Sequence, residues 1–596
     1  MVFRNAWSRV PRVGRRLIGL GIAAITVLLA IVLLARSNNR RFIADFIGVQ
    51  TKNQILTLYS MATEPTLNTD DLAPIRYANL PPYAVNTFLD QEVEADNVAR
   101  SLDLIHNAGF HFIKQELVWN DVERPQKGMF LDNAVEGRSS WAKYDRIVDL
   151  AAQRGIEVIF RIDTTPDWAR PGTTKIETPP ARYEDYGDFV AAVVARYQGR
   201  VHYYQIWNEP NWAFEWGDRV ARPAEYVSLL RTAYTMAKTV DPTVVIMSAS
   251  LAPTVENSER ATTDVSFLQQ MYANGARPFF DVLSANAYGL RNGPDDFRFN
   301  RQDDVNFSRP VLLRDIMVQN GDSSKPIWAS EIGWDALPAN WSQLPLLFGS
   351  VSRQLQAEYT VRAYERAAEQ WPWMGVMAVW HFRKVQLSDA QQQDYYFDLV
   401  STEWQPEPIY SALKNLIARP PIVHRGYHQQ DFYGLQWTSD WRQVADPRSS
   451  LGQSRVSSAP GATVSFDLDA TWLDLVTLTG PTQGKLAVTI DGTPYGANRL
   501  SVVNRVAVLP LASSTEQWQV RQPIADGLGP GVHHVVIRVL DGNSSIDAIV
   551  ADRESPRDVL FWKVTGIAIG LAIFAGTWLR ARLGLSTSAV VNGDSA

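Results

Sequence analysis

Gln205-Ile206-Trp207-Asn208-Glu209-Pro210-Asn211 is an apolar, β-prone run that stops abruptly at a glutamate. A second segment, Ile327-Trp328-Ala329-Ser330-Glu331-Ile332-Gly333-Trp334, has the same design and places Glu331 between two tryptophans. A carboxylate that follows a strand and is walled by aromatic rings is costly to desolvate, and it suits general acid, general base or nucleophilic chemistry. We therefore expect one active site if the fold brings Glu209 and Glu331 together.

The chain between residues 80 and 417 alternates β-like and helix-like segments, which is typical of βα units around a parallel sheet. The expected strands are 83–88, 110–117, 156–162, 201–207, 244–249, 282–287, 327–330 and 376–380. Eight such strands predict an α/β fold in which they close into a (β/α)8 TIM barrel, here assigned to residues 80–420. An open doubly wound sheet is the alternative, but no glycine-rich turn follows the first strand.

The order of the strands links the two glutamates. Counted along the chain, Glu209 ends the fourth expected strand and Glu331 ends the seventh. Catalytic residues of such barrels lie at the carboxyl ends of the strands, so both acids are expected on one rim. Two carboxyl groups on one rim are what cleavage of a glycosidic bond needs.

With these motifs in place, residues 80–417 resemble glycoside hydrolase clan A, the retaining (β/α)8 glycosidases. The nearest members are the β-xylosidase/α-L-iduronidase family and the cellulase-like families. The resemblance implies that Glu209, in the pair Asn208-Glu209, is the acid/base and that Glu331 is the nucleophile. It also implies that Tyr288, which follows the sixth expected strand, contacts the nucleophile.

Further side chains are expected to contact the substrate. The resemblance places Trp380 beneath the sugar, and it marks Asn286 as a departure, because many members have a histidine at that position. Asn208 is a candidate to bond the sugar 2-hydroxyl. Arg161 ends the third expected strand, where it either binds substrate or pairs with a nearby carboxylate. Flat aromatic faces that suit a pyranose ring are expected from Trp207, Trp212, Trp216, Trp334 and Trp380. For Trp212, Trp216 and Trp334 the alternative is a role in loop packing.

Residues 425–553 lose the helical periodicity and contain short alternating segments, separated by turns such as Asp491-Gly492. This pattern predicts an antiparallel β-sandwich with a jelly-roll-like arrangement. The domain is a candidate carbohydrate-binding module. Its tryptophans either bind glycan or belong to the core, and they are Trp437, Trp441, Trp472 and Trp518. Residues 36–79 are expected to be a spacer that packs partly on the barrel.

Two apolar runs predict transmembrane helices that flank these domains. Residues 17–35 carry no charge, and their length is close to the roughly 20 residues that cross a bilayer. A cleaved signal peptide is the alternative, but its apolar region would be shorter, about 7–15 residues. Residues 559–579 contain one lysine, Lys563, near the end of the run, where it can reach the interface. An amphipathic or buried helix is the alternative for this second run.

The arginines around the two runs predict their orientation. Five arginines precede the first run, and Arg580 and Arg582 follow the second. The positive-inside rule then predicts that residues 1–16 and the tail 580–596 are cytoplasmic. The barrel and the sandwich would face the outside of the cell membrane.

The composition argues against several classes of function. The net charge of −6 offers no basic face for nucleic acid. The absence of cysteine excludes disulfides, thiol catalysis and Cys-type zinc sites. The eight histidines lack ligand spacing, so neither a metal site nor a cofactor is predicted. The expected partners are a carbohydrate and, through the two helices, the membrane, while the oligomeric state stays open.

The sequence thus predicts a membrane-anchored, extracytoplasmic retaining glycoside hydrolase. It would act on oligo- or polysaccharides through a covalent glycosyl-enzyme. A transglycosylase with the same site is one alternative, because the two reactions differ only in the acceptor. A non-catalytic carbohydrate-binding protein is the other alternative, although a site that had lost its activity would not need both glutamates. Sugar, linkage and endo or exo action stay open.

Overall fold

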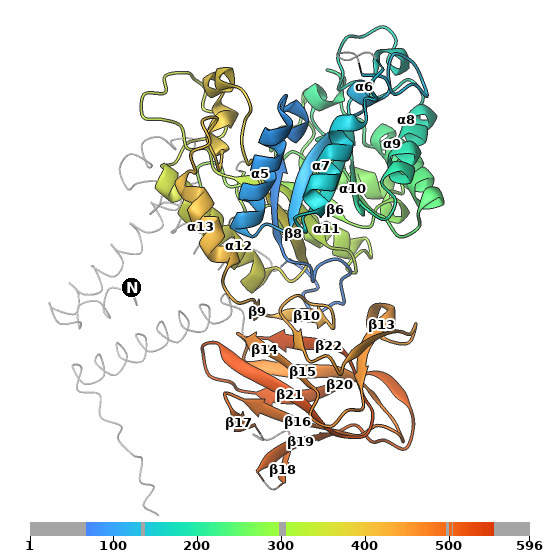
Figure 1. Cartoon of the computed structure of the whole chain (residues 1–596), viewed down its shortest axis with the longest axis vertical. Coiled ribbons are helices and arrows are strands. Elements are labelled where there is room, and N and C mark those ends of the chain that lie inside the picture. The colour runs from blue at the N-terminus through green and yellow to red at the C-terminus, as the bar shows by residue number, and fades with distance from the viewer. Residues whose placement is uncertain are drawn as a thin grey trace, which may run out of the picture. The chain divides into compact units, whose positions relative to one another are not determined.

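The computed structural model describes residues 67–553, apart from 133–136, 297, 299–304, 496–499 and 504. An α/β region is followed by a region made of strands (Figure 1). The predicted membrane spans 17–35 and 559–579 lie outside the described residues, as does most of the spacer. Within the described part, no helix is both long and apolar enough to cross a membrane.

Eight parallel strands form the first sheet, in the order β5-β4-β3-β2-β1-β8-β7-β6. The strands are β1 (Tyr83–Thr87), β2 (Phe112–Val118), β3 (Glu157–Asp163), β4 (Tyr203–Ile206), β5 (Val245–Met247), β6 (Leu283–Tyr288), β7 (Ile327–Gly333) and β8 (Met374–Val379). Parallel bridges from Met247 to Val282 and from Leu251 to Ala285 join its two ends. The predicted eight-stranded barrel is confirmed.

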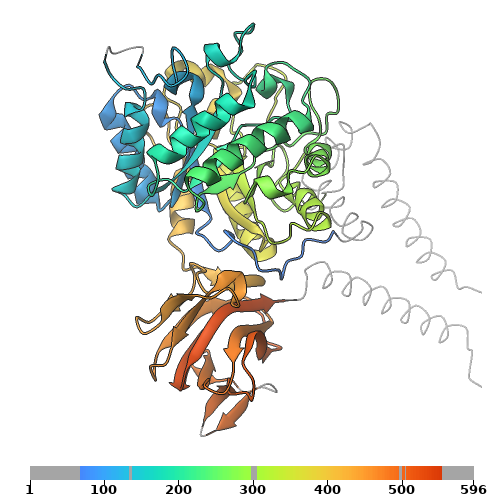
Figure 2. The same cartoon turned by 90° about the vertical axis from the view of Figure 1, so that its right-hand side faces the viewer.

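Helices cover the outside of the barrel (Figure 2). They are α5 (Ala95–Ala108), α6 (Trp119–Val122), α7 (Ala142–Ala152), α8 (Tyr183–Arg196), α9 (Pro223–Val240), α10 (Asp264–Ala273), α11 (Pro310–Gln319), α12 (Arg353–Gln370) and α13 (Pro408–Ile417). Their boundaries follow local chemistry. The hydroxyl of Ser352 accepts a hydrogen bond from the Leu355 amide at the start of α12. Gly109 ends α5 in the left-handed conformation, which glycine adopts without steric cost.

The inward-facing residues of the barrel change from apolar to polar along its axis. At the amino-terminal ends of the strands they form an apolar floor that includes Ala84, Phe112, Ile159, Val245, Val282, Trp328 and Val376. Two residues further along three of these strands come Asn86, Lys114 and Arg161. Because side chains alternate between the two faces of a strand, these polar residues share the inward face. The polar part of the interior therefore lies toward the carboxyl-terminal rim.

Two sheets form the C-terminal region. One has the order β12-β13-β22-β15-β20 with β10 beside β22, and the other has the order β11-β14-β21-β16-β19-β18 with β9 and β17 attached. The strands are β9 (Ile422–Val423), β10 (Gly426–Gln429), β11 (Gln436–Trp437), β12 (Arg442–Ala445), β13 (Gln453–Ser457), β14 (Thr463–Leu468), β15 (Trp472–Thr479), β16 (Lys485–Ile490), β17 (Thr493–Pro494), β18 (Ser501–Val503), β19 (Val506–Pro510), β20 (Gln517–Asp526), β21 (His533–Asp541) and β22 (Ser544–Asp552).

The inner faces of these two sheets share one apolar cluster, to which β14 contributes Phe466 and β15 contributes Leu475. The pairing is antiparallel except between β9 and β14, so the predicted second domain of strands is confirmed. Trp441 is buried in this cluster and Trp437 packs on it at a ring distance of 5.0 Å. Glycan binding by this domain stays a prediction.

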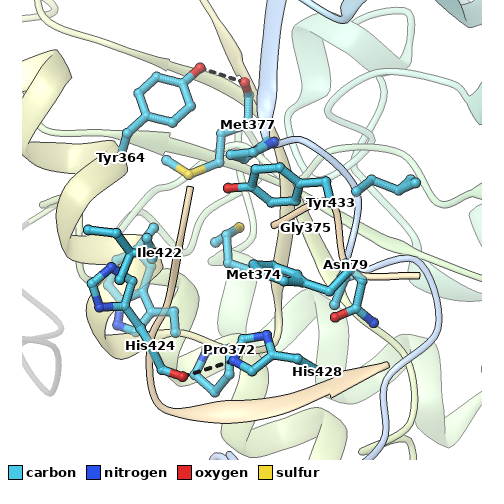
Figure 3. A pocket seen from close by; sticks show the side chains of 17 residues that line it. Asn79, Tyr364, Pro372, Met374, Gly375, Met377, Ile422, His424, His428 and Tyr433 are labelled. Carbon is cyan, nitrogen blue, oxygen red and sulfur yellow. Dashed lines mark hydrogen bonds between the residues drawn. The ribbon is translucent and has the colours of Figure 1, made fainter. Parts of the chain in front are cut away.

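A cavity lies at the amino-terminal end of the barrel strands (Figure 3). It is lined by residues from the start of β8 and from β9 and β10. The Tyr364 hydroxyl donates a 2.7 Å hydrogen bond to the Met377 carbonyl on its wall. Burial lowers the pKa of His428 to about 4, so this imidazole is neutral at pH 7. The cavity lies at the opposite end of the strands from Glu209 and Glu331.

Candidate active site

Glu209 and Glu331 converge on one amide group. Nδ2 of Asn286 donates hydrogen bonds of 2.6 Å to Oε1 of Glu209 and 3.1 Å to Oε2 of Glu331. These two carboxyl oxygens are therefore less than about 6 Å apart, whereas an inverting glycosidase spaces its carboxyl groups at about 6.5–9.5 Å. The site has the close spacing that direct attack by one carboxylate requires.

The chain leaves β4 in an unusual conformation that presents Glu209. Trp207 and Glu209 have φ angles of 72° and 34°, in the left-handed region that non-glycine residues rarely adopt. The Glu209 amide donates a 3.0 Å hydrogen bond to the Ser250 carbonyl, and Asn208 forms a bridge with the same residue. Such strained residues persist where the surroundings hold them in place, and they concentrate at functional sites. The predicted strand 201–207 thus ends one residue too late and also begins two residues too early, because β4 is Tyr203–Ile206.

A β-bulge in β7 presents Glu331. Ala285 pairs with Ala329, but Asn286 pairs with Glu331, so Ser330 is the extra residue. As a result Ser330 and Glu331 both point into the barrel, and the Ser330 hydroxyl donates a 2.8 Å hydrogen bond to Gln205. The predicted end of this strand at Ser330 is wrong, because β7 continues to Gly333. The apolar run marked the strand, but the bulge depends on pairing with β6.

Three donors surround the Glu331 carboxylate. Oε2 accepts hydrogen bonds from the Tyr288 hydroxyl at 2.8 Å and from Asn286, and Nζ of Lys114 lies 3.1 Å from Oε1. Burial is the main cause of a raised Tyr288 pKa, so the phenol keeps its proton at neutral pH. Burial also lowers the pKa of Lys114, while the charge of Glu331 acts in the opposite direction. Both oxygens of Glu331 thus accept from donors, and one of those donors is a cation.

Glu209 has the opposite electrostatic environment. Burial is the largest cause of a pKa raised to about 8, followed by the negative charges of Glu331 and Glu215. The hydrogen bond from Asn286 and the charge of Lys114 reduce this shift without cancelling it. Glu209 therefore holds a proton at neutral pH, whereas its neighbour Glu331 is paired with a cation. A protonated carboxyl group next to an ion-paired one is typical of a general acid beside a nucleophile.

The tryptophans that were expected to contact the sugar fall into two groups, those exposed to solvent and those buried in the protein. Trp380 follows β8, is partly exposed and meets the edge of Phe88 at 5.5 Å, and Trp212 is 40% exposed. Trp334 is fully buried, and its indole N–H donates to the Asn292 carbonyl. Trp207 and Trp216 are also buried. These three rings pack inside the protein and present no open face on which a sugar could stack. For Trp216 and Trp334 this is the packing alternative, and for Trp207 it is contrary to expectation.

Arg161 pairs with carboxylates, which was one of its two expected roles. Its guanidinium lies 2.7 Å from both Glu116 and Asp163. Asn208 accepts a 3.1 Å hydrogen bond from Ser250, and its side chain also bonds Glu215, whose pKa burial raises to about 7. The amide expected to meet the sugar 2-hydroxyl thus also orients Glu215.

Sequence reasoning missed Lys114, Glu116, Asp163 and Glu215. One signal was available, because Lys114 and Glu116 sit two residues apart, on either side of Gln115, in the buried strand Phe112–Val118. Two charges on one face of a buried strand are costly unless they are paired, so they mark a polar part of the interior. Glu215 gave no such signal, since it belongs to the short helical turn η3 (Ala213–Trp216) after β4.

Comparison with known proteins agrees with the fold and the chemistry of this site. Residues 77–257, which span β1 to β5 and include Glu209, match the family model described as Cellulase (glycosyl hydrolase family 5). This match confirms the resemblance to clan A. The chain carries a retaining glycoside hydrolase domain. A search of curated protein sequences found no match.

Several solved structures are similar to this chain. A family 39 glycoside hydrolase from Bacteroides cellulosilyticus is 20% identical, with a TM-score of 0.44, and the alignment covers 78% of this chain and 83% of that one. A monomeric β-xylosidase from Caulobacter crescentus is 15% identical, with a TM-score of 0.40 and coverage of 79% and 98%. The exo-β-1,4-mannosidase Op5Man5 from Opitutaceae bacterium strain TAV5 is 15% identical, with a TM-score of 0.41 and coverage of 60% and 64%.

Proposed function

We propose that the protein hydrolyses glycosidic bonds of oligo- or polysaccharides in two steps. In the first step an oxygen of Glu331 attacks the anomeric carbon while protonated Glu209 gives its proton to the leaving oxygen. In the second step Glu209 removes a proton from water, and the water oxygen displaces Glu331 from the anomeric carbon. Two inversions give a product of retained configuration. The single observation that supports this most is the Asn286 amide shared by both glutamates.

The surrounding residues have defined tasks in this reaction. Tyr288 and Lys114 hold the Glu331 carboxylate before attack, and they solvate it again when the glycosyl-enzyme breaks down. Trp380 supplies a partly open aromatic face for the C–H face of the sugar that is attacked. Asn208 precedes Glu209 in the chain and would bond the 2-hydroxyl, a contact that strengthens in the transition state.

The reaction is tested by following the first product. Aryl glycosides and soluble polysaccharides are screened with the full-length protein, and the anomeric signal of the first product is recorded by NMR before mutarotation. We expect the configuration of the substrate. An inverted first product would contradict the roles of both glutamates. A complete lack of turnover, by a protein whose circular dichroism spectrum shows that it is folded, would contradict the hydrolytic function.

We also propose that two membrane helices hold this domain on the outer face of the cell membrane. The support comes from the apolar runs 17–35 and 559–579 and from the arginines on their cytoplasmic sides. Substrates would then be glycans at or near the cell surface. Protease added to intact spheroplasts should digest the barrel and leave a tag placed after Ala596 protected. A protected barrel, or a soluble protein cleaved near residue 35, would contradict this topology.

A further inference from the structure

A hollow of about 290 Å³ crosses one sheet of the C-terminal domain. Each strand of the row β12-β13-β22-β15-β20 contributes to its lining. Val456 pairs with Arg442 on one side and with Ser545 on the other, so these three side chains stand in a row on the same face of the sheet. None of the described residues that line the hollow belongs to the apolar cluster between the two sheets. The hollow therefore lies outside the core of this domain.

Trp518 forms one wall of the hollow, and its ring is held in place. The Arg448 guanidinium lies 4.1 Å from the ring centroid, and the indole N–H donates a 2.9 Å hydrogen bond to Glu516. Arg448 also pairs with Glu516 at 3.0 Å and with Asp446 at 2.9 Å, so these side chains fix one another. Arg448 does not line the hollow, so Trp518 presents a part of its ring that the guanidinium does not cover. A ring fixed in this way loses little conformational entropy when a ligand stacks on it.

The other tryptophans that were expected either to bind glycan or to belong to the core are placed differently. Trp441 is buried between the two sheets, and Trp437 packs on it. Trp472 packs on a second, small apolar cluster, and the guanidinium of Arg521 lies 4.9 Å from its ring centroid. Of the four tryptophans, Trp518 is the one that lines the hollow.

The polar lining of the hollow suits the hydroxyl groups of a sugar. Gln483 and Asn543 supply amides that both donate and accept hydrogen bonds, and Arg442 supplies a guanidinium that donates. Ser544 and Ser545 also line the hollow and are only 1% and 3% exposed. Within the part of the chain that the structure describes, the hydroxyl groups of these two serines have no hydrogen-bond partner. Buried polar groups are nearly always bonded in native proteins, so the two hydroxyls indicate a ligand with donors and acceptors of its own.

The charges in and around the hollow balance. Among the described residues that line it, Arg442 and Asp446 are the charged ones, and their charges are opposite. Next to the hollow, Arg448 and Glu516 form a second pair of opposite charges. Arg455 lies between two lining residues of β13 and therefore points to the other face of the sheet. The carboxylate of a uronic acid would thus find no excess of positive charge here, whereas a neutral sugar needs none.

We infer that this hollow is a second glycan-binding site, which holds a neutral sugar unit of an oligo- or polysaccharide against Trp518. Its volume is near the lower end of the usual range of small-molecule sites, about 300–1,000 Å³, so it suits a short stretch of a glycan. Binding at this site needs neither Glu209 nor Glu331, and the inference therefore goes beyond the proposed function. The site would retain a polymeric substrate on the protein without taking part in the reaction.

Binding is measured by titration calorimetry on the full-length Glu331→Gln protein, so that the ligands are not cleaved. The probes are cellohexaose, xylohexaose and mannohexaose, which are neutral, and hexagalacturonic acid, which is not. We expect a neutral hexaose to bind, and Trp518→Ala to weaken its binding at one site about tenfold, because a buried tryptophan contact commonly dominates binding. Trp518→Phe should keep most of the affinity. The site in the barrel is the same in all these proteins and accounts for the binding that remains.

Two further variants make the binding test specific. Arg442→Ala changes an exposed side chain at the other edge of the hollow, and it should also weaken binding even if Trp518→Ala fails to fold. Val532→Ala removes an apolar side chain that is 54% exposed and lies before β21, and it should leave binding unchanged. The inference is overturned if no neutral hexaose binds, if only hexagalacturonic acid binds, or if the folded Trp518 and Arg442 variants bind as the parent protein does.

Kinetics separate this inference from the proposed function. On a polysaccharide that the wild type cleaves, Trp518→Ala should raise KM severalfold, while kcat/KM on a p-nitrophenyl glycoside should stay the same. Equal KM values on the polysaccharide, together with equal binding, would contradict the second site while hydrolysis stands. Failure of the wild type to cleave any glycoside would contradict the proposed function alone, because the calorimetric result decides whether the hollow binds glycan.

Discussion

Lys114 and Glu331 form an ion pair inside the barrel, with Nζ 3.1 Å from Oε1 and with side chains that are 3% and 6% exposed. Neither charge reaches bulk water, so each depends on the other and on nearby dipoles. The Lys114 ammonium group also lies 3.4 Å from the Ser330 carbonyl, at the bulge that turns Glu331 inward. The pair therefore links the electrostatics of the nucleophile to the backbone that presents it.

Removing one charge of this pair should lower the free energy of unfolding more than removing both charges. Lys114→Met leaves Glu331 buried without its cation, and we expect a loss of about 3–5 kcal/mol in the free energy of unfolding. The double variant Lys114→Met/Glu331→Gln should recover a large part of that loss. Urea denaturation of the wild type, Lys114→Met, Glu331→Gln and the double variant measures the coupling energy. Additive effects would show that the pair contributes nothing to stability.

The two glutamates should respond differently to substitution. Glu331→Gln should abolish turnover of every substrate, because no other group can form the glycosyl-enzyme. Glu209→Gln should reduce kcat/KM by about 10²–10⁴-fold on substrates with poor leaving groups and much less on activated aryl glycosides. Azide should partly rescue Glu209→Ala and give a glycosyl azide of retained configuration. Equal losses on both kinds of substrate, without rescue, would mean that Glu209 is not the acid/base.

The raised pKa of Glu209 predicts the alkaline limb of the pH profile. Glu209 must be protonated to act as the acid, and its pKa of about 8 means that the protonated form declines above that pH. For a substrate with a poor leaving group, kcat/KM should therefore fall tenfold per pH unit well above pH 8. In Glu209→Gln this limb should be absent from the residual activity on an activated aryl glycoside. A limb that persists there would belong to another group.

Substitution of Trp334 should mainly lower stability, whereas substitution of Trp380 should mainly lower activity. Trp334→Ala removes a fully buried ring and should lower the free energy of unfolding by about 3–5 kcal/mol. Trp380→Ala removes a partly exposed ring after β8 and should mainly lower kcat/KM. Chemical denaturation and kinetics on one glycoside, at a temperature where both variants are folded, make the comparison. A loss of binding without loss of stability in Trp334→Ala would restore its expected role at the substrate.

Asp335 should make the fold less stable at alkaline pH. It is fully buried, and burial raises its pKa to about 8 despite the opposing charge of Arg353. The folded state then binds a proton between about pH 4 and 8 that the unfolded state releases, so stability falls as pH rises through this window. Asp335→Asn should raise the urea midpoint at pH 8, and this gain should fade toward pH 4. Glu184→Gln, at a side chain that is 71% exposed, is the control.

Much of the barrel could be predicted from local patterns. Apolar β-prone runs of strand length and helix-length stretches that end before glycine are local signals, and both follow from how each element buries one face. The pairing of Glu209 with Glu331 was also predictable, because strand order alone places the ends of the fourth and seventh strands on one rim. The paired sheets after the barrel followed from short alternating segments and turns.

The amino-acid sequence by itself thus determined the barrel and the place of the two glutamates on one rim, because both depend on residue type and strand order. Tyr288, which lies between them in the chain, was expected from the family resemblance. Tertiary structure alone decided the bulge at Ser330, the shared amide of Asn286 and the partner of Lys114. It also decided that Trp334 is buried while Trp212 is open, although both follow similar motifs. The reason is physical: register, burial and charge pairing depend on neighbours that are far apart in the chain, and no local pattern encodes them.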